Sequence, residues 1–337
     1  MTFLAQAAQS IVDAHVGNFW LVLLIKAAAV LGFFLVAPLG VGYTEHKVLA
    51  HMQSRYGPME AGGFHGWAQL VADGVKFVQK EDVIPQAADP LVFSLAPAVA
   101  LIPYIVVIVV IPFSNTVFAE NLDVGIFFVL AMSSVNVIGV LMAGWSSANK
   151  FSLIGALRAA AQLIAYELPL VLAAAAVVMQ AGTLSLIGIS EAQRHYWFVI
   201  SQAPGFLIFM MASLAELTRP PFDMPVADSE IIFGAYTEYT GLKFAFFLLS
   251  EYGGIVVLAA IASVLYLGGY LPLPALPIPE PLMMLGKIGA LSFVIIWLRA
   301  TYPRLREDQL QRFSWLVLIP LTLLQIMVVA VVKVAVR

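Results

Sequence analysis

The stretch GLKFAFFLLSEYGGIVVLAAIASVLYLG (241–268) decides the fold. It is apolar over a run longer than the about 20 residues that a helix needs to cross a bilayer. Lys243 and Glu251 are its only charged residues. Apolar and polar residues do not alternate along it at the period of a β-strand, which disfavours an outer-membrane barrel. The stretch therefore predicts a membrane-spanning helix with an acid inside it.

The composition extends this prediction to the whole chain of 337 residues. Hydrophobic residues make up 61% and charged residues 11%, against about 45–50% and about 25% in soluble domains. We therefore expect one all-α membrane domain over 1–337, with about eight transmembrane helices in contact with the lipid bilayer. The expected spans are 19–43, 90–112, 124–147, 160–181, 196–217, 241–268, 283–300 and 314–334.

Basic residues fix the expected orientation, because loops on the cytoplasmic side carry an excess of lysine and arginine. Outside the spans, Arg194 and Arg337 are the only basic residues of one set of loops and tails. The loops with the remaining basic residues should face the cytoplasm, which puts both termini on the periplasmic side. These loops are 44–89, 148–159, 218–240 and 301–313.

The longest of these loops contains a predicted amphipathic helix over 65–80. It is too short and too charged to span a membrane, so we expect it to lie along the membrane interface. Its apolar residues share one face at helical spacing. They are Trp67, Leu70, Val71, Val75 and Val78.

Several kinds of chemistry are excluded by the residues that the chain lacks. There is no cysteine, which excludes disulfides, thiolate nucleophiles and cysteine-bound iron–sulfur clusters. The five histidines are scattered, so we expect no metal site. The near-neutral charge gives no sign of nucleic-acid binding. Any redox chemistry then belongs to a diffusible substrate or to partner subunits.

Three acids lie in or at the ends of predicted spans: Glu167, Glu216 and Glu251. A carboxylate inside a membrane is costly unless it is paired, hydrated or protonated. Each acid either pairs with a base and fixes helix packing, or belongs to a hydrated chain of acids that passes protons. We favour the second interpretation, because buried carboxyls have raised pKa values that suit proton transfer.

The segment AELTRPPFDMPVADSEIIFGAYTEYTG (215–241) is the most polar part of the chain. Arg219 is its single arginine or lysine, and three prolines prevent a continuing helix. This excess of acid predicts a proton-accepting site or a docking face for a basic partner; a plain solvated loop is the alternative. Its acids are Glu216, Asp223, Asp228, Glu230 and Glu238.

These residues carry a family resemblance. The chain resembles the membrane protein of respiratory complex I that joins the membrane and peripheral arms, known as the H subunit, or chain 1, of NADH–quinone oxidoreductase. The series AEL, RPPFD, SE and TEY within 215–241 is long and chemically particular. Further matching stretches are TEHKVLAHMQSRYGP (44–58), ADGVKFVQKED (72–82), GWSSANKFSLIGALRAAAQLIAYELP (144–169), FFLLSEYG (246–253) and RATYPRLREDQL (299–310).

The resemblance implies a subunit of a proton-translocating enzyme complex in the bacterial inner membrane. Such a subunit forms much of the chamber that admits quinone, and it has no redox centre of its own. Quinone, expected to be ubiquinone, is the substrate and is not covalently bound. Flavin and iron–sulfur clusters belong to other complex I subunits, which are the expected partners. The segment 215–241 lines the chamber, and the helix over 65–80 frames its entrance.

The resemblance also assigns residues to two roles. The implied proton path comprises Glu167, Glu216 and Glu230, with Asp228 and Glu238 nearby, and Glu251 joins it as an acid inside a span. The implied quinone chamber comprises Glu45, Lys47, Arg219, Phe222, Asp223 and Arg299. Reduction of quinone near the acids would draw in protons and bias the buried acids.

Two departures from the family pattern limit this transfer. The usual Glu-Arg-Lys reads Glu45-His46-Lys47 here, so one fixed charge becomes dependent on pH. The usual Pro-Glu-Ala-Glu-Ser-Glu reads PVADSE over 225–230. One acid is therefore lost and another is shorter by a methylene, and no relay role is carried over to Val226.

Three other functions stay open from the sequence. One is a stand-alone proton-coupled transporter, although no internal repeat is evident between the halves. Another is the anchor subunit of a related membrane-bound hydrogenase or formate-oxidising complex. The third is a purely structural anchor without quinone contact. The peripheral subunits that co-purify with the chain distinguish the first two from complex I.

Overall fold

The computed structural model describes residues 10–15, 18–272 and 278–335. Within these ranges the regular structure is helical, and no strand is present. Seven helices are long and apolar enough to cross a membrane, as expected for a polytopic α-helical protein. They are α2 (Phe19–Met52), α4 (Pro90–Ile108), α5 (Gly125–Ser146), α6 (Lys150–Ala181), α11 (Gly241–Tyr266), α12 (Glu280–Thr301) and the run Glu307–Ala335.

The last of these runs has three parts. It consists of α13 (Glu307–Phe313), a π-helical turn over Ser314–Leu318, and α14 (Ile319–Ala335). The predicted loop 301–313 is therefore partly helical, because α13 leads directly into the last span.

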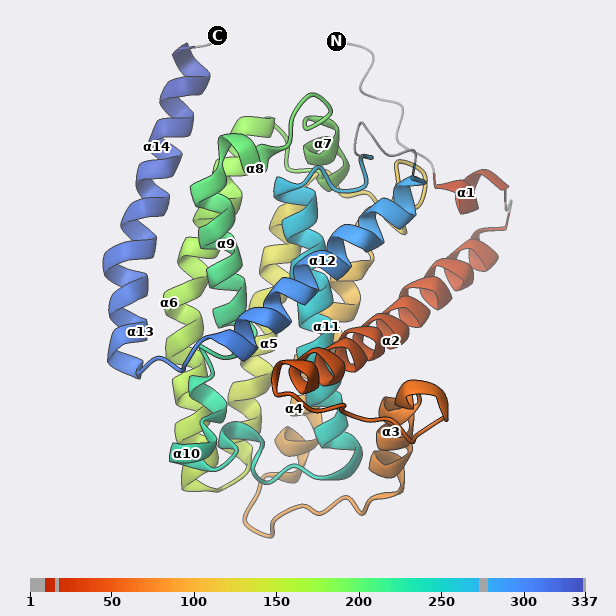
Figure 1. The fold of residues 1–337 in the computed structure, drawn as a ribbon, viewed down its shortest axis with the longest axis vertical. Coiled ribbons are helices and arrows are strands. Elements are labelled where there is room, and N and C mark those ends of the chain that lie inside the picture. Colours follow the sequence, from red (N-terminus) through yellow and green to blue (C-terminus); the bar gives the residue numbers. More distant parts are fainter. Residues whose placement is uncertain (1–9, 16–17, 273–277, 336–337) are drawn as a thin grey trace.

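The predicted span 196–217 differs from the structure. It is divided into α8 (Phe198–Ser201) and α9 (Ala203–Glu216), with a break at Gln202. Pro204 explains the break, because it has no N–H to donate to the carbonyl oxygen of Ile200, four residues earlier, and its ring crowds that carbonyl, whereas a proline is tolerated in the first turn of a new helix. The Gln202 side chain then bonds to Ala176 O at 3.2 Å. With 14 residues, α9 alone is shorter than the about 20 that a span requires. Together with α8, however, it covers 198–216 and runs alongside α6 through the bundle (Figure 1).

Two spans extend further than their apolar runs. Helix α2 continues to Met52, so Glu45 and Lys47 lie on a helix and not in a loop. Helix α6 begins at Lys150, where the side chain of Asn149 accepts a hydrogen bond from the Phe151 N–H. The predicted span 19–43 therefore ends too early and the predicted span 160–181 begins too late, because a helix that is satisfied by its own hydrogen bonds continues beyond its apolar residues.

Helix α11 lies at the centre of the bundle, where it packs against α2, α4 and α12 (Figure 1). The helix runs unbroken through Gly253 and Gly254. These glycines let neighbouring side chains approach closely. A Cβ on Gly253 would meet the Phe34 ring of α2, and one on Gly254 would meet Leu217 and Tyr104.

The helix predicted over 65–80 is α3 (Gln69–Gln79), preceded by a short turn, η1 (Phe64–Gly66). Leu70 contacts Gly42 of α2, whereas Val71, Val75 and Val78 are exposed. Helix α3 thus docks on the bundle along one edge and presents an apolar edge outward.

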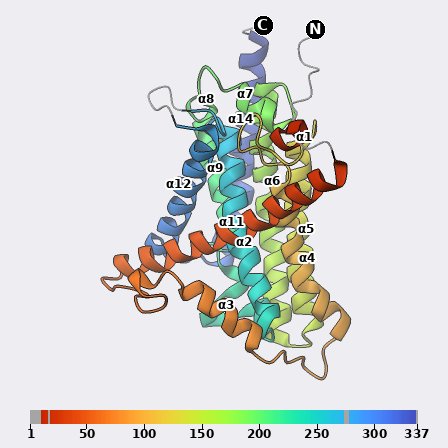
Figure 2. The ribbon, with the colours of Figure 1, turned by 90° about the vertical axis from the view of Figure 1, so that its right-hand side faces the viewer.

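The segment 217–240 connects α9 to α11 through short helical turns: η2 (Met224–Val226), α10 (Asp228–Ile231) and η3 (Gly234–Tyr236). In Figures 1 and 2, α3 lies at the opposite end of the bundle from α1 (Ile11–His15) and α7 (Leu186–Glu191). Figure 1 places α10 at the same end as α3. The polar segments of the chain therefore gather at one end.

Candidate functional site

A buried arginine organises the centre of the site. Arg219 follows α9 closely and is 1% exposed. Its Nη1 donates to Glu45 of α2, and its Nε lies 2.9 Å from Oε1 of Glu251 on α11. The guanidinium also lies over the ring of Tyr252, 4.8 Å from its centroid. One side chain thus joins α2, α11 and the polar segment.

A second arginine completes this cluster. Arg299 of α12 donates to the other carboxylate oxygen of Glu45, and its side chain is one third exposed. We call Glu45, Arg219, Glu251 and Arg299 the ion cluster. Burial disfavours the charged form of Arg219, but Glu251 and Glu45 outweigh this effect and hold the pKa of Arg219 above its ordinary value. Mutual compensation makes buried charges of this kind tolerable.

A second group of acids lies beside the ion cluster. Glu216, the last residue of α9, is buried and lies beside Ser133 of α5. The next residue, Ser134, donates to Glu167 of α6. The carboxyls of Glu216 and Glu167 are close enough to interact electrostatically. Two acids from different helices are therefore linked through neighbouring hydroxyl groups.

Tyr104 lies between this acid pair and the ion cluster. It is a fully buried side chain of α4, and its hydroxyl accepts a hydrogen bond of 3.1 Å from the amide of Asn136. Both Glu216 and Glu251 interact with it electrostatically. Tyr104 therefore interacts electrostatically with one acid of the pair and with one acid of the ion cluster.

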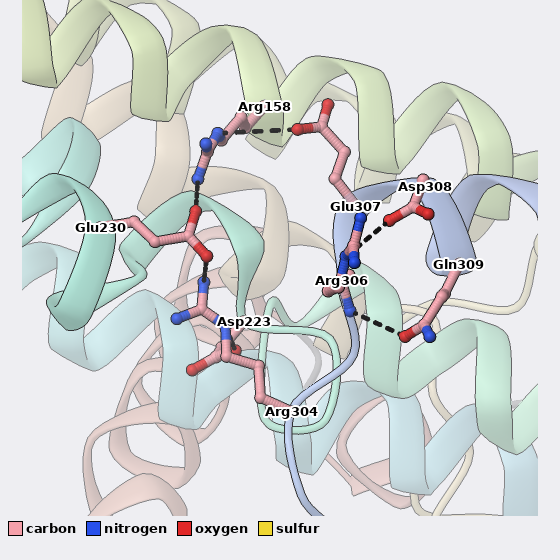
Figure 3. A network of polar contacts seen from close by, with 8 residues as sticks. All are labelled: Arg158, Asp223, Glu230, Arg304, Arg306, Glu307, Asp308 and Gln309. Carbon is pink, nitrogen blue, oxygen red and sulfur yellow. Dashed lines mark hydrogen bonds and ion pairs between the residues drawn. The ribbon is translucent and has the colours of Figure 1, made fainter.

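A third polar group lies at the end of the bundle that carries α10, and Figure 3 shows it. We call it the surface group; its members are Arg158, Asp223, Glu230, Arg304 and Glu307. Arg158 of α6 lies 2.5 Å from Glu230 and 3.8 Å from Glu307. Arg304 lies 2.9 Å from Asp223 and 3.9 Å from Glu230. The Arg158 hydrogen bond, together with the charges of Arg158 and Arg304, holds the pKa of the Glu230 carboxyl below its ordinary value.

The structure brings some of the predicted site residues together and separates others. Glu45, Arg219, Glu251 and Arg299 meet, as do Glu167 and Glu216. Lys47 turns away from the cluster toward the carbonyl oxygen of Pro58. Glu230 is half exposed in the surface group.

Three further predicted residues lie elsewhere. Glu238 accepts a hydrogen bond of 2.5 Å from Asn149. Phe222 is buried, with its ring edge-on to Tyr166 at 5.3 Å. Asp228 begins α10, but its side chain lies outside the described part of the structure.

Sequence reasoning missed the groups that connect the acids. They are Tyr104, Ser133, Ser134 and Tyr252. Each is a polar side chain inside an apolar span, and this was the available signal. Small hydroxyl residues are common in membrane helices, however, so the signal does not single them out. Among the described residues, no three His, Asp or Glu side chains form a group that could hold a metal ion.

A helical bundle with ion pairs and acids inside its spans defines a polytopic α-helical membrane protein. Comparison with known sequences makes this class specific. The chain belongs to the NADH dehydrogenase family, whose profile matches residues 25–330.

Three curated relatives are named as the H subunit of NADH-quinone oxidoreductase. One from Geobacillus kaustophilus (strain HTA426) is 46% identical over 290 residues, which cover 86% of this chain and 87% of the relative. One from Geobacillus thermodenitrificans (strain NG80-2) is 45% identical over 305 residues, covering 90% and 91%. One from Bacillus thuringiensis subsp. konkukian (strain 97-27) is 44% identical over 306 residues, which also cover 90% and 91%. The resemblance drawn from the motifs is confirmed.

Proposed function

We propose that the chain is the subunit of NADH-quinone oxidoreductase that forms much of the wall of the quinone chamber and couples quinone reduction to proton transfer. The observation that carries the proposal is the buried ion cluster, in which Arg219 joins Glu45 to Glu251. Membership of the family supports a part in NADH–quinone oxidoreduction, and the placement of these charges supports the role proposed for this chain.

The chemistry requires both electrons and protons. Conversion of a quinone to a quinol consumes two electrons and two protons. The chain has no cysteine to bind an iron–sulfur cluster. In this proposal the electrons come from flavin and iron–sulfur clusters of partner subunits, as the family resemblance implies. The part of the reaction left to this chain is to hold the headgroup and to supply or respond to protons.

The ion cluster suits the headgroup. Arginine side chains are fixed, always charged donors for anionic oxygens. Arg299 and Glu251 are its partly exposed members, each about one third exposed, whereas Arg219 and Glu45 are buried. The exposed pair therefore meets the substrate, and the buried pair fixes its position.

The linked acids suit proton transfer into the bundle. The series runs from Glu251 past Tyr104 to Glu216, and through Ser133 and Ser134 to Glu167. Its members come from α4, α5, α6, α9 and α11. A change in charge at the quinone alters the proton affinity of the nearest acids, and the change passes along the series toward neighbouring subunits of the membrane arm.

The surface group has a separate role in this proposal. Asp223 and Glu230 are held by Arg158 and Arg304 at the polar end of the bundle. In this proposal the peripheral arm docks at the end of the bundle that carries Glu230. The chain resides in the bacterial cytoplasmic membrane. The end that carries most of the lysines and arginines of the loops faces the cytoplasm, and both termini lie on the periplasmic side.

Photo-crosslinking with a quinone analogue in the purified complex tests the proposal, with a ubiquinone analogue as the first probe. Peptide mapping should find label on the segments around Glu45, Arg219 and Arg299, and excess unlabelled quinone should remove it. Label confined to other subunits, at full occupancy of the quinone site, contradicts the role of this chain in the chamber.

A further inference from the structure

A buried glutamine on α6 holds the segment that carries Arg219. Gln162 is 1% exposed. Its Nε2 donates two hydrogen bonds, one of 2.7 Å to the carbonyl oxygen of Ala215 and one of 2.6 Å to that of Phe222. These two carbonyls lie before and after Arg219 in the chain. A single side-chain amide on α6 therefore binds both ends of the segment 215–222.

The segment 215–222 has little to hold it from within. Pro220 and Pro221 have no N–H to donate, and Thr218 has a positive φ of 51°. Its internal backbone bonds include Thr218 N to Ala215 O at 3.1 Å and Phe222 N to Arg219 O at 2.8 Å. The conformation of the segment therefore depends on groups of neighbouring elements.

Other contacts each hold one part of the segment. Near its start, the Leu217 N–H donates to Ser213 O at 3.0 Å and the Arg219 N–H donates to Leu214 O at 3.4 Å. The Phe222 ring packs against Tyr166, one turn after Gln162 on α6. The Leu305 N–H donates to Pro221 O at 3.1 Å. Neither of these last two contacts reaches Ala215, where α9 ends and the segment begins. Among the contacts described, Gln162 alone spans both ends of the segment.

We propose that Gln162 is a positioning residue for Arg219: its amide fixes both ends of the segment 215–222, so that the guanidinium reaches Glu45 and Glu251. The inference rests on the role proposed above for the ion cluster. Removal of the amide leaves two buried carbonyls without this donor. An unsatisfied buried group costs free energy, so the segment relaxes toward conformations that loosen the contacts of Arg219.

The test uses the assembled complex with Gln162→Met, which keeps the length of the side chain and removes its donors. The matched control is Gln180→Met on the same helix, because the Gln180 amide bonds to Tyr196 and Ser201 away from the segment. Arg219→Lys is the third variant. Two quantities are measured: amide hydrogen exchange of the peptide over 214–223, and KM and kcat for quinone.

Gln162→Met should speed exchange in that peptide by about ten-fold. It should also raise KM for quinone by about five-fold or more, with kcat within about two-fold, because a displaced arginine weakens headgroup binding. Gln180→Met should leave both quantities unchanged. When Gln162→Met is combined with Arg219→Lys, KM should equal that of Arg219→Lys alone, because the glutamine acts through the arginine.

Two results overturn the inference. One is unchanged exchange over 214–223 in assembled Gln162→Met. The other is faster exchange with an unchanged KM, in a complex whose KM does respond to Arg219→Lys. If exchange is faster but KM responds to neither variant, Gln162 does hold both ends of the segment 215–222. That result instead overturns the proposed role of Arg219 in quinone binding.

Discussion

Arg219 and Glu45 lie 174 positions apart in the chain, yet their side chains pair in the interior, with exposures of 1% and 2%. Glu45 also pairs with Arg299. One carboxylate thus compensates two arginines from different segments. The arrangement joins the ends of α2 and α12 to the segment after α9, and it sets the first prediction.

Glu45→Gln should destabilise the protein strongly. The substitution keeps the shape of the side chain but leaves Arg219 with less compensation in the interior, and breaking a buried pair in this way costs about 3–5 kcal/mol. We expect a lower yield of intact complex and a lower melting temperature of the purified enzyme. Glu60→Gln, at an exposed position after α2, is the control. Equal yields and melting temperatures for the two variants contradict the prediction.

Glu216→Gln should uncouple proton transfer while the complex still assembles. The amide occupies the same volume beside Ser133 but cannot ionise, so it cannot pass a proton toward Glu167. Coupled proton pumping should fall by about ten-fold or more, measured as acidification by proteoliposomes during NADH oxidation. Glu120→Gln, an exposed residue of the loop between α4 and α5, should pump normally. Full pumping by Glu216→Gln would show that Glu216 is not part of the proton path.

The pH dependence of the surface group follows from the lowered pKa of Glu230. A carboxyl whose pKa is lowered by folding stabilises the fold above its unfolded pKa of about 4.5, and this contribution is lost as the pH falls through the lowered value. We therefore expect hydrogen exchange over 223–231, corrected for the intrinsic rate, to stay constant from about pH 7 to 5 and to rise in more acidic solution. Arg158→Gln should move the rise to higher pH. A rise at the same pH in both proteins means that Arg158 does not control Glu230.

Gly254→Ala should destabilise the centre of the bundle. The added Cβ would lie 2.7 Å from Leu217 and 3.0 Å from the Tyr104 ring, and overpacking of this kind costs about 1–3 kcal/mol. The control is Gly286→Ala on α12, where a Cβ meets nothing within 4 Å. The control should be neutral or stabilising by up to about 1 kcal/mol, since alanine favours a helix. Thermal unfolding of the complex measures both variants, and equal midpoints contradict the prediction.

The sequence was sufficient to predict the fold class and most spans, because long apolar runs have few alternatives in a membrane. It was not sufficient for the run 196–217, where hydropathy stays high across the break at Gln202. Nor did it place the ends of α2 and α6. Hydropathy shows which residues favour contact with lipid, whereas a helix ends where its backbone hydrogen bonds end.

The candidate site was predicted in part. Glu45, Glu251, Arg219 and Arg299 were recognised as individual charges, and the structure groups them. Their pairing was not visible in the sequence, because it depends on contacts between segments far apart in the chain. Lys47 illustrates the same limit, since a shift of two positions along α2 from Glu45 turns its side chain toward Pro58.

The ion cluster contains two arginines and two glutamates, so its formal charges sum to zero. The four side chains come from α2, α11, α12 and the segment after α9, so their attraction ties three helices and that segment together without leaving a net charge in the bundle. Loss of any one of the four side chains leaves the other three with a net charge of one unit, which is costly where water is scarce.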